Sequence, residues 1–265
     1  MRIGLYQGAP RLLETAANLE IMARNAKAAA LQGARLLVFP ELFLTGYNLL
    51  EDCPRVAEPK DGPAFQALSA LAKATGIALL YGYPERAGDT VYNSAQLIDA
   101  GGGSIANYRK CHLFGPDERR LFAPGDTAVT ATLDGMTVGI LICYDIEYPE
   151  FFRTLVLRGA DLVLVPTAIG TPYEAVPTTI VRARAYENQV FVAYCNLAGE
   201  ERGLGYFGMS GIVGPDGRDI VRAGGQDESL LIADIDTAAY AASRQANTYI
   251  RDRRPELYGA VARTR

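Results

Sequence analysis

Short, nearly continuous apolar runs recur along this 265-residue chain, separated by segments of helical character. Such runs suit strands that are buried on both faces, because neither side of the pleat then needs polar side chains. The predicted strands are residues 3–7, 36–39, 77–83, 138–143, 162–165 and 190–195. Two hairpins are predicted as well, with turns rich in glycine. Their strands are 93–99 with 104–108, and 210–213 with 219–221.

Three helices are predicted between these strands. Residues 15–31 are rich in alanine with charges spread along them, and Gly33 follows as a cap. Residues 63–74 and 149–158 both begin with proline. The first helical turn tolerates proline because its N–H groups have no partner within the helix.

The two halves of the chain resemble each other. Residues 33–40 read GARLLVFP, and residues 159–166 read GADLVLVP. Each segment is followed by a helix, an apolar strand and one of the hairpins. Two similar strand–helix turns can arise by chance, but the shared order of elements favours a duplicated α/β unit. Two such half-sheets packed face to face, with helices outside, predict a four-layer αββα sandwich in one domain over residues 1–265.

Composition and charge narrow the function classes. Hydrophobic residues make up 49% and charged residues 21%, which excludes a disordered, collagen-like or coiled-coil chain. The net charge of −4 gives no overall attraction to nucleic acid or to an anionic membrane, so we expect neither as a partner. No signal peptide and no apolar run of about 20 residues is apparent. We therefore expect a soluble, cytoplasmic protein.

Histidine and cysteine usage limits the chemistry further. His112 is the one histidine, which argues against multi-histidine metal sites. The four cysteines form no C-x-x-C pair, and no G-x-G-x-x-G follows a predicted strand. We expect free thiols in a reducing compartment, no metal and no cofactor.

Three reactive side chains stand where predicted strands end. Glu41 follows residues 36–39, Lys110 follows a hairpin strand, and Cys143 ends residues 138–143. Ligands of α/β sheets gather at the carboxyl ends of strands. A carboxylate, an amine and a thiol meeting there can serve as base, oxyanion donor and nucleophile.

Each of these residues also has a structural interpretation when it is taken alone. Glu41 can be a surface residue, and Lys110 can be a solvated hairpin end. Most free cysteines are inert small hydrophobes, which is our expectation for Cys53, Cys111 and Cys195. Cys143 differs because a strand-to-helix turn exposes a side chain and brings a helix N-terminus near a thiolate. We expect packing or supporting roles for two polar neighbours, His112 and Asp145.

Three motifs in order resemble the nitrilase superfamily of carbon–nitrogen hydrolases. They are PELFLTGY (40–47), YRKCHLFG (108–115) and ICYDIEYPE (142–150), and the resemblance extends to the tail YIRDRRPELY (249–258). Within the superfamily the chain looks most like bacterial 5-aminopentanamidase-type amidases, a group that includes stereoselective amidases of cyclic amino-acid amides.

The resemblance implies roles for specific residues on the αββα fold. It identifies Cys143 as nucleophile, Glu41 as general base and Lys110 as the third member of the triad. Glu118, in GPDERR, stands where the family carries a second glutamate, although the match is looser there. The backbone N–H of Tyr144 would join Lys110 in holding the oxyanion.

The implied reaction is hydrolysis of a small primary amide to a carboxylate and ammonia through a cysteine thioester. The expected substrate is an ω-amino or amino-acid amide such as 5-aminopentanamide. Alternatives are an ω-amidase, an N-carbamoyl-amine hydrolase, a nitrilase, or a non-catalytic binding protein of the same fold. The resemblance also implies a homodimer or larger homo-oligomer, with the tail, residues 246–265, in subunit contacts.

Glu147 is a candidate for the residue that selects substrates by their charge. Many relatives that act on acidic substrates read C-Y-D-x-R, whereas this chain has Glu147 at the arginine position. A carboxylate so near the nucleophile would favour a substrate that carries an ammonium group. The alternative is that Glu147 supports the start of the following helix or pairs with an arginine.

Overall fold

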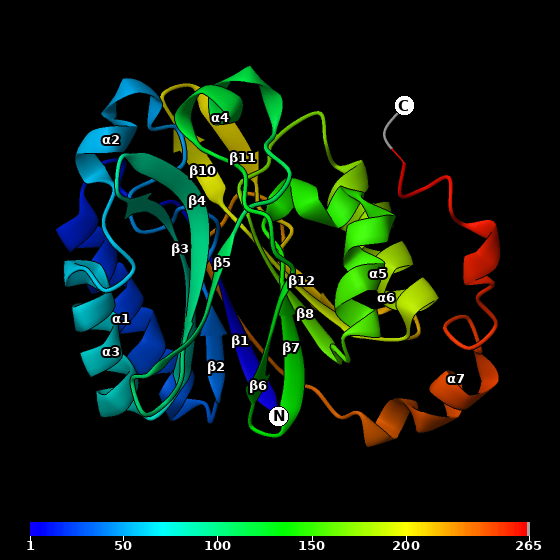
Figure 1. The fold of residues 1–265 in the computed structure, drawn as a ribbon. Coiled ribbons are helices and arrows are strands. Elements are labelled where there is room, and N and C mark those ends of the chain that lie inside the picture. Colours follow the sequence, from blue (N-terminus) through cyan, green and yellow to red (C-terminus); the bar gives the residue numbers. More distant parts are fainter. Residues whose placement is uncertain (264–265) are drawn as a thin grey trace.

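The computed structural model describes residues 1–263, which contain two six-stranded sheets flanked by helices (Figure 1). The α-helices are α1 (Thr15–Leu31), α2 (Cys53–Val56), α3 (Pro63–Thr75), α4 (Gly115–Leu121), α5 (Pro149–Leu157), α6 (Val181–Asn188) and α7 (Ala241–Ala246). The three helices predicted from the sequence are confirmed as α1, α3 and α5, with ends that agree to within one residue. Within these described residues, no helix is both long and apolar enough to cross a membrane.

The first sheet has the strand order β14-β1-β2-β3-β4-β5. Its strands are β1 (Arg2–Gln7), β2 (Leu36–Val38), β3 (Ala78–Ala87), β4 (Thr90–Ile98), β5 (Ser104–Arg109) and β14 (Ser229–Asp234). The second sheet has the order β13-β12-β9-β8-β7-β6. Its strands are β6 (Val129–Leu133), β7 (Met136–Ile140), β8 (Leu162–Thr167), β9 (Phe191–Asn196), β12 (Gly211–Val213) and β13 (Asp219–Arg222). A separate hairpin consists of β10 (Ala198–Glu201) and β11 (Leu204–Phe207).

Strand pairing confirms the duplicated unit. In the first sheet β1, β2 and β3 are parallel neighbours, and β4 and β5 follow as antiparallel strands. In the second sheet β7, β8 and β9 are parallel neighbours, and β12 and β13 follow in the same way. The register matches too. Ile3 faces Leu36 at the start of β2, and Val138 faces Leu162 at the start of β8.

The layers follow from the alternation of side chains along each strand. Ile3 and Leu5 of β1 join the core between the sheets, which also contains Val138 and Ile140 of β7. Residues on the other face of the first sheet, such as Leu37, pack against α1 and α3. Figure 1 shows α1 and α3 outside one sheet and α5 and α6 outside the other. The structure is therefore the predicted αββα sandwich.

Two strand predictions need correction. The strand expected over residues 138–143 ends at Ile140, and Cys143 begins a 3₁₀ turn, Cys143–Glu147. Cys143 has a φ of 48°, a left-handed conformation that cannot continue a strand. The apolar run at residues 77–83 continues as β3 to Ala87, because it pairs with β4 over its whole length. The sequence analysis also missed β6, β10, β11 and β14.

Candidate active site

Glu41 lies in a tight turn directly after β2, and its side chain is fully buried. The turn packs onto β3 at Gly82, where a Cβ atom would lie 2.3 Å from the backbone nitrogen of Leu42. Only glycine allows that approach. The backbone N–H of Leu44 also donates to the carbonyl of Gly82. Gly82 thus sets how close the Glu41 turn lies to the first sheet.

Lys110 follows β5 immediately and lies beside this carboxylate. Its side chain is completely buried, and its Nζ donates to Oε1 of Glu41 and to Oε1 of Glu118, each at 2.7 Å. Asn93, on the neighbouring strand β4, donates to the same Glu41 oxygen at 2.7 Å. The other oxygen of Glu41, Oε2, is buried and has no hydrogen-bond partner among residues 1–263. A buried carboxylate oxygen left open in this way can accept a proton from a reacting group.

Glu118 enters the cluster from α4. Its Oε1 accepts a hydrogen bond from the Tyr47 hydroxyl at 2.7 Å as well as the bond from Lys110. Its Oε2 accepts from the backbone N–H of Phe114 at 2.8 Å. Both oxygens of Glu118 are therefore occupied, which suits a residue that orients Lys110 rather than one that exchanges protons.

Cys143 approaches the cluster from the second sheet, at the start of the 3₁₀ turn after β7. Its left-handed φ belongs to the strained class of conformations that cluster at functional sites. The backbone of Ala168, which follows β8, acts to lower the pKa of the Cys143 thiol. The side chain is buried, and the charges of Glu41, Lys110 and Glu118 interact with it electrostatically. The structure thus brings together the four side chains that the sequence analysis singled out.

Asp145 ties the cysteine turn to the lysine segment. Its Oδ1 accepts from the backbone N–H of His112 at 2.9 Å and lies 2.8 Å from His112 Nδ1. Its Oδ2 accepts from the Tyr108 hydroxyl at 2.7 Å and from the backbone N–H of Ile142 at 3.0 Å. The His112 ring stacks on Tyr148, with ring centroids 3.9 Å apart. One buried carboxylate therefore fixes the spacing between residues 108–112 and the turn that carries Cys143.

Burial and charge set the protonation states of the cluster. Burial raises the pKa of Glu41 to about 7, against the opposing effect of Lys110. Burial, followed by the Glu41 charge, raises the pKa of Cys143 well above its usual value, so the sulfur is a thiol at neutral pH. For Lys110, burial alone would lower the pKa, but Glu118 and Glu41 outweigh it and raise the pKa well above the usual value. A protonated thiol beside a carboxylate of near-neutral pKa is the arrangement that general-base activation needs.

Cys143 opens into a pocket of about 80 Å³, which we call the inner pocket. Its lining includes Cys143, Tyr144, Glu147, Tyr47, Phe114 and Leu204. Burial raises the pKa of Glu147, and Lys110 and Arg184 partly oppose this effect.

The arginine whose charge acts on Glu147 has other hydrogen-bond and ion-pair partners. Arg184 donates to the backbone carbonyls of Ile146 and Glu147, and its guanidinium pairs with Glu187 at 3.1 Å. These contacts leave the Glu147 carboxylate available to the inner pocket.

The sequence analysis missed three residues of the site. Tyr47 closes the PELFLTGY motif, and Asn93 begins a predicted hairpin strand, so each was visible as a polar residue near a functional segment. Glu201, on β10, carried no such signal. It is buried, and its carboxylate accepts from the backbone N–H groups of Tyr47 and Asn48 and from the Tyr206 hydroxyl. Glu201 therefore connects the β10–β11 hairpin to the loop that supplies Tyr47.

Comparisons with known proteins agree with this geometry. Residues 2–245 match the model of the carbon-nitrogen hydrolase family. The chain is 49% identical to a protein described as a hydrolase in the pqqF 5′ region of Pseudomonas protegens, covering 99% of this chain and 92% of that protein. It is 39% identical to an (R)-stereoselective amidase of a Pseudomonas species, covering 98% and 93%.

A solved structure extends the likeness to three dimensions. The crystal structure of an amidase from Nesterenkonia sp. superposes with a TM-score of 0.90 at 36% identity, covering 98% of this chain and 96% of that one. A glutamate-to-glutamine mutant of that amidase shows Michael addition of acrylamide at its active-site cysteine. With the αββα fold and the buried cluster, these matches establish that the chain belongs to the carbon–nitrogen hydrolase family and is an enzyme of the nitrilase superfamily.

Proposed function

We propose that this hydrolase is an amidase that converts a small primary amide into a carboxylate and ammonia, with Cys143 as nucleophile. The observation that carries the proposal concerns Oε2 of Glu41. This oxygen is buried without a hydrogen-bond partner among residues 1–263, in a cluster that also contains Lys110 and Cys143. The other oxygen of Glu41 is held by Lys110 and Asn93, so the carboxylate has a fixed orientation and one free acceptor.

In the first half-reaction, Glu41 accepts the Cys143 proton as the sulfur attacks the amide carbonyl carbon. The negative charge passes to the carbonyl oxygen, where Lys110 and the backbone N–H of Tyr144 stabilise it. The C–N bond then breaks, and Glu41 returns its proton to the departing nitrogen, which leaves as ammonia. A Cys143 thioester remains.

In the second half-reaction, Glu41 accepts a proton from water as the water oxygen attacks the thioester. The C–S bond breaks, the carboxylic acid leaves, and Glu41 returns the proton to the sulfur. In this scheme Glu118 keeps Lys110 in place through both half-reactions, because both of its own oxygens are already occupied.

We further propose that the substrate carries an ammonium group, as in an ω-amino or amino-acid amide. Glu147 supports this proposal because it lines the inner pocket together with Cys143. At about 5 Å and an effective dielectric near 20, the attraction is roughly 3 kcal/mol before desolvation. One relative is described as an (R)-stereoselective amidase, and such selectivity requires a chiral amide, which most amino-acid amides are.

The test is ammonia release from 5-aminopentanamide, pentanamide and the monoamide of glutaric acid. We expect 5-aminopentanamide to exceed both others by about tenfold or more in kcat/KM. Glu147→Gln should remove most of that preference, whereas Glu150→Gln, an exposed acid on α5, should keep it. Equal losses on charged and neutral amides would assign Glu147 a structural role. A nitrile or a ureido compound as the better substrate would favour the nitrilase or N-carbamoyl-amine hydrolase alternative.

We also propose that the chain forms a homodimer or larger homo-oligomer through its C-terminal segment. Tyr249, Leu257, Tyr258 and Val261 are large apolar residues of this tail that remain exposed in the single chain. Figure 1 shows the tail, in orange and red, beside α5 and α6 rather than within the sandwich. Residues 264–265 of the predicted tail lie outside the described residues. Light scattering tests the proposal, and a 28.6 kDa monomer would overturn it.

A further inference from the structure

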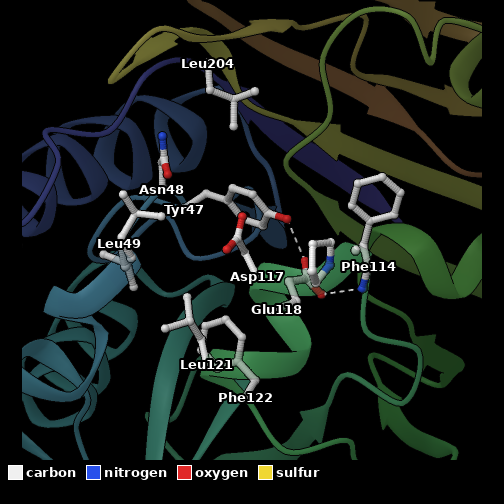
Figure 2. Close-up of a pocket in the computed structure, with 12 residues that line it drawn as sticks. Tyr47, Asn48, Leu49, Phe114, Asp117, Glu118, Leu121, Phe122 and Leu204 are labelled. Atoms are coloured by element: carbon white, nitrogen blue, oxygen red, sulfur yellow. Dashed lines mark hydrogen bonds between the residues drawn. The ribbon is translucent and has the colours of Figure 1, made fainter.

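A second pocket, of about 180 Å³, adjoins the inner pocket, and we call it the outer chamber (Figure 2). Three side chains line both spaces: Tyr47, Phe114 and Leu204. Figure 2 shows Leu204 on one side of the outer chamber and Leu121 and Phe122 on the opposite side. The larger part of the free volume next to Cys143 therefore lies beyond these three shared side chains.

The two spaces are both largely apolar and differ in their reactive and charged groups. The inner pocket contains the nucleophile and Glu147. The outer chamber is lined mainly by apolar side chains, namely those of Leu49, Leu50, Leu121, Phe122, Leu204 and Phe114.

The acids of the outer chamber have other partners. Glu118 is occupied by Lys110, Tyr47 and the Phe114 N–H. The Asp117 side chain is 69% exposed and lies 3.5 Å from Arg120. A guest in the outer chamber thus meets chiefly hydrocarbon.

We propose that the outer chamber is an acyl-group subsite, which holds the apolar part of the substrate while the amide group reacts at Cys143. The class of substrate it selects is a primary amide whose acyl group contains several methylene groups. The inference rests on the proposed amidase function and deepens it. It is independent of Glu147, because neutral alkyl amides engage the outer chamber without any ammonium group.

Leu50 is the residue that tests this subsite most cleanly. It lines the outer chamber but not the inner pocket, and it is 37% exposed, so a larger side chain need not disturb the core. Its φ is 48°, a conformation that aspartate tolerates better than most residues. Leu50→Trp would fill the chamber, and Leu50→Asp would place a charge in it. Leu31, at the end of α1 and 89% exposed, provides matched controls with the same two replacements.

The experiment measures kcat/KM by ammonia release for propanamide, butanamide, pentanamide and hexanamide. Each buried methylene contributes about a fourfold gain at most, so we expect hexanamide to exceed propanamide by about tenfold or more. Leu50→Trp and Leu50→Asp should reduce that ratio to about twofold or less, and Leu31→Trp and Leu31→Asp should preserve it. A circular dichroism spectrum and a urea-unfolding midpoint that match the wild type confirm that each variant has folded, and if Leu50→Trp fails this check, Leu50→Asp decides.

The outcomes separate the two proposals. Ammonia release with a flat chain-length series in the wild-type enzyme, or with a ratio that both Leu50 variants leave intact, would overturn the acyl subsite alone. No ammonia from any primary amide, including 5-aminopentanamide, would overturn the proposed function, and the subsite assignment with it.

Discussion

Glu41 and Lys110 form a fully buried ion pair, with Oε1 and Nζ 2.7 Å apart, and the two residues come from turns that follow different strands of the first sheet. Burying two charges costs free energy that their attraction only partly offsets, so such a pair is weak evidence for a stabilising role. Here Glu118 adds a second negative charge to the same ammonium group. A chemical role explains the arrangement, because it holds Oε1 of Glu41 in place and leaves Oε2 without a hydrogen-bond partner among residues 1–263.

Cys143→Ala should abolish turnover and leave the fold intact. We expect ammonia release to fall by roughly 10³-fold or more, because the thiol is the covalent nucleophile in the proposed mechanism. Cys53→Ala, Cys111→Ala and Cys195→Ala are the controls, and each should keep activity apart from packing losses. Retention of a tenth of the wild-type rate by Cys143→Ala would rule out the thioester route.

Glu41 should control the acid limb of the pH profile. Its pKa is raised to about 7 by burial, so the carboxylate form that accepts the thiol proton increases as the pH rises through this value. We expect kcat/KM to increase with pH up to about 7 and then to level. Glu41→Gln should lower kcat by roughly 10²-fold or more and should also slow alkylation of Cys143. A mutant whose alkylation rate and pH dependence match the wild type would show that Glu41 is not the base.

Tyr47→Phe tests the support of Glu118 without removing a proposed catalytic group. The mutation deletes the 2.7 Å hydrogen bond from the phenol to the Glu118 carboxylate, which is a bond to a charged acceptor. Such bonds contribute about 1.5–3 kcal/mol, so kcat should fall by roughly 10–100-fold. Tyr92→Phe, at a ring that stacks under Arg109 outside the cluster, is the control. If only KM rises, Tyr47 contacts substrate and does not act through Glu118.

The charge of the cluster should govern its reaction with electrophiles. The charges of Glu41 and Glu118 act on Cys143, and Glu147 lines its pocket. The opposing positive charges are Lys110 at the cysteine and, at Glu147, Arg184 as well. Neutral iodoacetamide should therefore alkylate Cys143 faster than iodoacetate, by about tenfold or more at equal concentration. Glu147→Gln should reduce the difference between the alkylation rates of the two reagents. Equal rates with the two reagents would show that the pocket does not discriminate by charge.

Glu201 should matter for stability more than its position on a hairpin suggests. Glu201→Ala leaves the N–H groups of Tyr47 and Asn48 and the Tyr206 hydroxyl without their acceptor. Unsatisfied buried donors cost about 1–3 kcal/mol each, so we expect a loss of roughly 3 kcal/mol in the free energy of unfolding, measured in urea. Glu200→Ala, at the exposed neighbouring position, should cost little. Similar losses for the two variants would contradict the role assigned to the Glu201 carboxylate.

Most of the fold could be predicted because its signals are local. The buried strands read as apolar runs, and the repeated segments at 33–40 and 159–166 predicted the duplication. The edge strands β6 and β14 escaped because their residues are mostly half-buried and lack a continuous apolar run. The left-handed turn at Cys143 escaped because cysteine gives no hint of a positive φ.

The candidate site also combines residues that the sequence predicts with residues that it does not. Glu41, Lys110 and Cys143 stand at strand ends, so the topology brings them together, and Glu118 was placed by resemblance. Tyr47, Asn93 and Glu201 act through hydrogen bonds between segments far apart in the chain. Glu201 is separated from the loop it holds by about 150 residues, and no periodicity or motif encodes such a pairing.

The matched register of the two units has a consequence for how the chemistry is divided between them. Because Ile3 corresponds to Val138 and Leu36 to Leu162, the counterpart of Cys143 in the first unit is Gly8, and the counterpart of Glu41 in the second is Thr167. In the proposed mechanism each unit thus supplies one member of the nucleophile–base pair, and at the matching position it has a residue that cannot replace the other member. The labour is therefore divided between the halves, and neither half can carry out the chemistry without the other.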